Sequence, residues 1–120
     1  MTPPMFIQLK HKTLNVYSSV KELVNEVYKL SILLPQEEKF NMVQQIRRAA
    51  LSVKLNLAEG CTRKSAVERK RYLVVSRGSV VEIDAVLEVA YDLNYVKKED
   101  IERISELLNK CFAMLSKMIG

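Results

Sequence analysis

Four stretches of the chain repeat apolar or small residues at alternating intervals of three and four positions. This spacing places the apolar side chains on one side of an α-helix and is typical of helices that pack side by side. We term each set a seam, and the seams are, in chain order, Val16, Val20, Leu23, Val27, Leu30 and Leu34; Val43, Ile46, Ala50, Val53 and Leu57; Tyr72, Ser76, Ser79, Ile83, Val86 and Ala90; and Ile101, Ile104, Leu108, Cys111, Leu115 and Met118. Four seams with short connections predict an all-α, antiparallel, up-down-up-down four-helix bundle.

Turn-forming residues are scarce, because the 120 residues include only three glycines and three prolines. A β-sandwich or barrel of this size needs more turns than that supply allows. Pro35, followed by Glu37 and Glu38, indicates the first turn of the second helix. We therefore expect an N-terminal arm at residues 1–11 and a bundle at residues 12–120, with helices at about 12–33, 35–59, 65–93 and 98–118.

Local signals mark the helix ends. Gly60 and Asn94 are predicted to end the second and third helices in the left-handed conformation. Ser65 and Glu68 have the spacing of a capping box at the start of the third helix. Asn56 and Glu59 lie near the end of the second helix, where we expect them to satisfy backbone groups that lack helical partners.

Side chains for catalysis are sparse. His11 is the sole histidine, so a Ser-His or Cys-His pair would have to use it. Cys61 in a connection and Cys111 on a seam lack a C-x-x-C pattern, and we interpret both as thiols in a reduced cytoplasm. No phosphate-cradling glycine motif, signal peptide or membrane-length apolar run is present. The sequence predicts a cytoplasmic protein that is not an enzyme and needs no metal, cofactor, membrane or small-molecule substrate.

Positive charge is concentrated in one segment. Residues 39–78 hold ten basic and two acidic residues, a net charge of +8, whereas residues 79–120 carry −3 and residues 1–38 are neutral. Clustered lysine and arginine can bind a polyanion by releasing its counterions, and they can equally form a solvated face that keeps a protein soluble. The candidate nucleic-acid-binding residues are Arg47, Arg48, Lys54, Arg63, Lys64, Arg69, Lys70, Arg71 and Arg77.

The third helix has a second apolar stripe, formed by Val74, Gly78, Val81 and Ala85. A companion stripe of small and polar residues on the second helix includes Ala49 and Ser52. These stripes would either widen the core of one bundle or form an interface between subunits. Gly78 favours the interface, because a glycine inside a helix costs about 1 kcal/mol that close packing could offset.

Several short runs together resemble one bacterial family. They are Gln45-Ile-Arg-Arg-Ala-Ala50, Ser52, Asn56-Leu-Ala-Glu-Gly60, Arg63-Lys-Ser65 with Glu68, Tyr72-Leu73, Gly78-Ser79 with Glu82, Val27-Tyr-Lys-Leu30, Leu34-Pro35 and Leu93-Asn-Tyr95. The combined pattern is similar to the four-helix bundle proteins encoded in intervening sequences of large-subunit ribosomal RNA genes. The accessory variability determinant of diversity-generating retroelements is a related bundle.

This resemblance implies a homo-oligomeric ring, typically a pentamer, that binds RNA or DNA. It supplies no catalytic residues. Two functions follow as hypotheses. The first is electrostatic binding of structured nucleic acid, RNA above all, in a ribosome-associated or rRNA-associated role. The alternative is a protein-interaction scaffold whose basic face docks an acidic partner or a reverse transcriptase.

Overall fold

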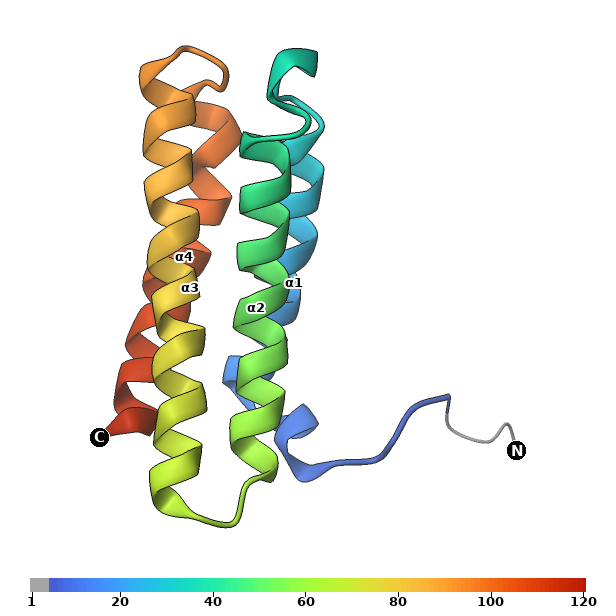
Figure 1. Ribbon diagram of the computed structural model, residues 1–120, viewed down its shortest axis with the longest axis vertical. Coiled ribbons are helices and arrows are strands. Elements are labelled where there is room, and N and C mark those ends of the chain that lie inside the picture. The colour runs from blue at the N-terminus through green and yellow to red at the C-terminus, as the bar shows by residue number, and fades with distance from the viewer. Residues whose placement is uncertain (1–4) are drawn as a thin grey trace.

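The computed structural model describes residues 5–120 as four long helices that lie side by side (Figure 1). Figure 1 shows α1 and α3 running in one direction and α2 and α4 in the other, so the predicted all-α four-helix bundle is confirmed. The helices are α1 (Asn15–Ser31), α2 (Met42–Thr62), α3 (Ala66–Asp92) and α4 (Lys98–Ile119), and two 3₁₀ turns, η1 (Lys10–Thr13) and η2 (Gln36–Glu38), precede α1 and α2.

The core forms along the predicted seams. Every seam residue of α1 is buried, from Val16 to Val27 and on to Leu34 beyond the helix end. Burial of such side chains contributes about 1.5–3 kcal/mol each, which is what stabilises helices of this length. Within the described residues, no helix has both the length and the apolar character that a membrane crossing requires.

Four of the six predicted seam residues of α3, Ser76, Ser79, Ile83 and Ala90, are buried, and the buried side also takes in the next positions along the chain. Leu73, Val80 and Leu87 are buried, whereas Tyr72 and Val86 are only half-buried at the edge of the core. Because α3 carries apolar residues on several sides, their spacing alone does not identify the side that faces the partner helices.

Gly60 lies inside α2 and does not end it, contrary to the prediction. The helix continues to Thr62, and Arg63 is the first extended residue. A Cβ atom built at Gly60 would lie 3.1 Å from Cβ of Tyr72 and 3.3 Å from the carbonyl oxygen of Arg69. The glycine therefore allows α2 and α3 to approach closely near their connection.

Small polar residues join α2 to α3 further along. The Ser76 hydroxyl donates to the carbonyl of Val53 at 2.7 Å, and the Ser79 hydroxyl donates to the Ser52 hydroxyl at 2.7 Å. Asn56 donates to the Ser52 carbonyl at 2.9 Å within α2. This contact between α2 and α3 is the most extensive in the bundle.

Two helix starts were predicted too early. Pro35 is extended, residues 36–38 form only η2, and α2 begins at Met42, the first buried residue after Leu34. Without a buried face, residues 36–41 gain too little from packing to form an α-helix. Likewise, Leu14 is extended and separates η1 from α1, and α1 ends at Ser31.

Caps at the ends of α3 follow the sequence signals. Asn94 has a φ of 62°, as its predicted left-handed conformation requires. Tyr95 then donates its backbone N–H to the Ala90 carbonyl at 2.9 Å, and Asn94 donates to Tyr91 at 3.0 Å, the hydrogen bonds of a Schellman motif. At the other end, the Ser65 hydroxyl accepts from the Glu68 backbone N–H at 3.3 Å.

The predicted arm at residues 1–11 is partly outside the described residues, which exclude 1–4. Residues 5–9 are exposed, and η1 then brings His11 against the bundle, where the imidazole is buried. The imidazole meets the Tyr17 ring edge-on, with the ring centres 5.3 Å apart. The last part of the arm is therefore packed against α1.

Candidate nucleic-acid interface

The alternating helix directions bring four segments together at one end of the bundle, the lower end in Figure 1. There α1 and α3 begin, and α2 and α4 end. Residues 10–16, 59–71 and 113–120 hold eight lysines and arginines and two glutamates, a net charge of +6. We call this the basic end, and its cations are Lys10, Lys12, Arg63, Lys64, Arg69, Lys70, Arg71 and Lys117.

The opposite end of the bundle is acidic. Residues 26–40 and 88–103 hold eight acidic and five basic residues, a net charge of −3. Since the molecule extends 44 Å along its longest axis, the two ends are separated by several Debye lengths, each about 8 Å at physiological ionic strength. The charge asymmetry seen along the sequence thus becomes a polarity along the bundle axis.

Lys64, Lys70 and Arg71 are exposed on the connection and the first turns of α3. Basic side chains at a helix N-terminus oppose the helix dipole, so they weaken α3 slightly. Nothing that α3 needs for its own stability therefore explains their presence. Their exposure at the basic end makes them the strongest candidates for contact with phosphate.

Arg63 is committed to the connection between α2 and α3. Its guanidinium donates to the Glu59 carboxylate at 2.6 Å and to the Tyr72 hydroxyl at 3.1 Å. The same group lies 4.9 Å from the centre of the Tyr72 ring. The hydrogen bond to Tyr72 and the charge of Glu59 raise the pKa of Arg63. The Glu59 carboxylate thus binds the Arg63 side chain, whereas the sequence predicted that it would bind backbone groups.

Arg47 and Lys54 are engaged with tyrosines of α1. The Arg47 guanidinium lies over Tyr28 of α1 at 5.0 Å and donates to the Ser31 hydroxyl at 2.8 Å. Lys54 lies over Tyr17, 5.5 Å from the ring centre. These contacts join α1 to α2, each worth about 0.5–1 kcal/mol at an exposed site.

Two further candidates lie on other faces. Arg77 donates to the Ser116 hydroxyl at 3.1 Å and lies over Phe112, so it faces α4. Arg48 is exposed on α2 and donates to Gln45 at 2.9 Å. The nine predicted cations are therefore not one surface: Arg63, Lys64, Arg69, Lys70 and Arg71 gather at the basic end, and the other four pair with side chains of α1, α2 or α4. Lys10, Lys12 and Lys117, which lie outside the basic segment of the sequence, join the first five at the basic end.

The second apolar stripe of α3 lies outside the core. Val74 and Val81 are 42% and 50% exposed, and Gly78 and Ala85 are exposed beside them. A Cβ atom at Gly78 would meet no atom within 4 Å. The stripe therefore does not widen the core of a single bundle.

The companion residues on α2 were assigned wrongly to a subunit interface. Ala49 is 1% exposed, and Ser52 bonds to Ser79 within the same chain. Both are on the side of α2 that packs against α3, where small side chains let the helices approach. They belong to the intramolecular contact.

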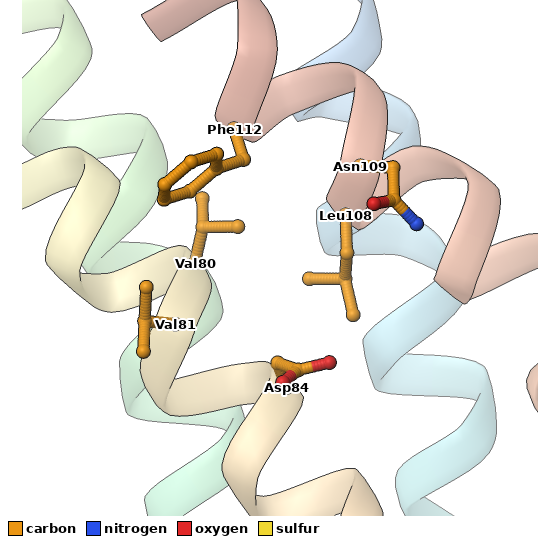
Figure 2. A pocket seen from close by; sticks show the side chains of 6 residues that line it. All are labelled: Val80, Val81, Asp84, Leu108, Asn109 and Phe112. Carbon is orange, nitrogen blue, oxygen red and sulfur yellow. The ribbon is translucent and has the colours of Figure 1, made fainter. Parts of the chain in front are cut away.

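A pocket of about 220 Å³ opens between α3 and α4 next to the second apolar stripe of α3. Figure 2 shows its lining, in which Val80, Val81, Leu108 and Phe112 supply hydrocarbon and Asp84 and Asn109 supply the polar atoms. It shares Val81 with the stripe, so the apolar surface continues from α3 towards α4. Among residues 5–120, no three His, Cys, Asp or Glu side chains gather as a metal site would require.

The two cysteines provide a test of how α2 and α4 are packed in the bundle. Burial raises the pKa of the Cys111 thiol to about 11, and burial also raises the pKa of half-buried Cys61, against the opposing charge of Arg69. At about pH 8 only on the order of one Cys111 in a thousand is the reactive thiolate. Iodoacetamide is expected to modify Cys61 in the native protein and Cys111 only after unfolding, as read by mass spectrometry. Equal native rates would contradict the packing of α4.

Comparison with known proteins relates the chain to one family. A model of the family described as 23S rRNA-intervening sequence protein matches residues 12–117. A crystal structure of a protein with unknown function from the S23 ribosomal protein family of Bacteroides thetaiotaomicron VPI-5482 is similar, with a TM-score of 0.80 and 24% identity. The similarity covers 88% of this chain and 98% of that one, and it shows the shared fold. No curated protein matches the chain.

Proposed function

The chain belongs to the 23S rRNA-intervening sequence protein family, and we propose that it is a cytoplasmic, non-enzymatic, oligomeric bundle that binds structured RNA electrostatically through its basic end. The observation that carries this proposal is the charge polarity along the bundle axis. A net charge of +6 at one end and −3 at the other orients a polyanion towards the basic end.

The binding mode follows from the kind of side chain present. Lys64 on the α2–α3 connection and Lys70 and Arg71 on the first turns of α3 are exposed cations, suited to phosphate oxygens. Tyr72 beside them is engaged by Arg63, so base stacking is not part of the proposal. Affinity should therefore depend strongly on salt and weakly on sequence.

The proposal is tested with purified protein and an RNA hairpin from 23S rRNA, measured by filter binding at about 50 mM salt, where phosphate contacts are strongest. A duplex DNA of equal length separates RNA from DNA binding. Saturable RNA binding is expected. The alternative, a scaffold for an acidic protein or a reverse transcriptase, predicts no RNA binding and a protein partner that stays bound after nuclease treatment.

We propose that the second apolar stripe of α3 assembles the bundles into a ring, by family resemblance a pentamer. Each added copy would present another basic end to the same RNA and raise the effective concentration of cations. Exposed apolar side chains at Val74 and Val81 and the open surface at Gly78 support an interface there.

Changing Val81 to lysine is expected to dissociate the oligomer without unfolding the bundle. The side chain is half-exposed in the single chain, so the substitution should change its stability by about 0.5 kcal/mol or less. Light scattering should give a smaller mass than that of the parent protein. Ile32→Lys, an exposed apolar residue after α1, is the matched control and should leave the mass unchanged. A parent protein that is already monomeric would contradict the interface.

A further inference from the structure

A notch of about 280 Å³ lies at the basic end, where η1 meets the bundle. Four separate parts of the chain line it: Lys10, His11 and Leu14 before α1, Cys61 of α2, Arg69 of α3 and Met118 of α4. Residues far apart in sequence thus converge on one small space, large enough for a tetrahedral anion with its water.

The polar lining is positive. Lys10 and Arg69 are cations, His11 is the one imidazole of the chain, and no carboxylate lines the notch. Arg69 donates to the Lys64 carbonyl at 3.2 Å, which holds its guanidinium near the α2–α3 connection.

The charged groups that line the notch or lie next to His11 in the described contacts are basic. Lys12 comes from its own turn, Lys54 of α2 lies over the Tyr17 ring that the imidazole contacts, and Arg69 comes from α3. Lys117 of α4 lines the neighbouring hollow beside Leu14. Burial first, and the charge of Lys12 second, lower the pKa of His11. The imidazole is therefore neutral near pH 7.

We propose that the notch is a phosphate subsite, in which Lys10, Arg69 and the protonated imidazole of His11 hold one phosphate group. The part of this inference that names RNA as the source of the phosphate rests on the proposed function. A phosphate among these groups supplies the negative charge that the imidazole lacks, so it favours the protonated form. Binding then takes up a proton, and affinity increases as pH falls.

Because His11 is the only histidine, its contribution can be isolated. RNA affinity is measured at constant salt from about pH 7.5 to 5.5, the range in which an imidazole titrates. The parent protein is expected to bind up to about tenfold more tightly at the lower pH, the effect of one unit of pKa displacement. His11→Gln should bind RNA at the higher pH and lose this gain. Parallel pH profiles for the two proteins would overturn the subsite.

A second measurement does not depend on RNA. Inorganic pyrophosphate should slow alkylation of Cys61 in the notch, relative to the rate without pyrophosphate at the same ionic strength. Arg69→Gln, on a different element from His11, should abolish this protection. Protection without RNA binding would support the subsite and overturn RNA as its source. RNA binding with no protection and no His11-dependent pH effect would overturn the subsite and leave the proposed function standing.

Discussion

Replacing Lys64, Lys70 and Arg71 with glutamate is expected to weaken RNA binding on the order of a hundredfold or more at low salt. The three exposed cations become anions, and the formal net charge of the chain changes from +5 to −1. Each lost phosphate contact also removes a released counterion, so the remaining affinity should vary less with salt. Filter binding across a salt series measures both effects.

The matched control places the same charge change at the other end. Lys39, Lys97 and Lys98 are exposed there, and replacing all three with glutamate gives the same net charge. Screening over the length of the bundle should hold the loss of affinity to about threefold or less. Equal losses in the two variants would show that net charge alone drives binding, and the basic end would no longer be the site.

Gly60→Val is expected to lower the free energy of unfolding by about 2–3 kcal/mol, through overpacking between helices. The new Cβ atom would meet Cβ of Tyr72 at 3.1 Å, the Arg69 carbonyl oxygen at 3.3 Å and a methyl of Leu73 at 3.3 Å. Two of these atoms are held by the α3 backbone or next to it, so the helices must separate. Urea unfolding followed by circular dichroism measures the change.

Gly78→Val is the control for this substitution. The helix propensity changes by the same amount, but no atom lies within 4 Å of the added Cβ in the single chain. Its stability at low protein concentration should stay within about 0.5 kcal/mol of the parent. If both variants lose the same stability, the account of Gly60 as the residue that allows α2 and α3 to approach closely would be contradicted.

The sequence was sufficient for the fold because three seams have one clear apolar side. On α1 every predicted seam position is buried. On α3 four of the six predicted positions are buried, but the core also takes in Leu73, Val80 and Leu87. The sequence did not show this, because α3 carries apolar residues on several sides and only the positions of α2 and α4 decide which of them are covered. Gly60 shows a similar ambiguity, since a glycine after a seam suits a helix end and a close helix contact equally.

The candidate site was predicted less completely. The sequence located an excess of cations in residues 39–78, but it did not show that Arg47 and Lys54 face tyrosines of α1. Those pairings depend on how two helices lie against each other. Lys10 and His11 were assigned to an arm, and only the packing of η1 against the bundle brings them to Arg69.

The central claim is that the basic end binds RNA through phosphate contacts, and the salt dependence of the parent protein's affinity tests it most directly. Binding of a 23S rRNA hairpin is measured between about 50 and 200 mM salt. We predict a linear fall of log K with log salt, with a slope of about −4, corresponding to roughly four to six phosphate contacts. A slope near zero, or no binding at the lowest salt, would contradict the claim.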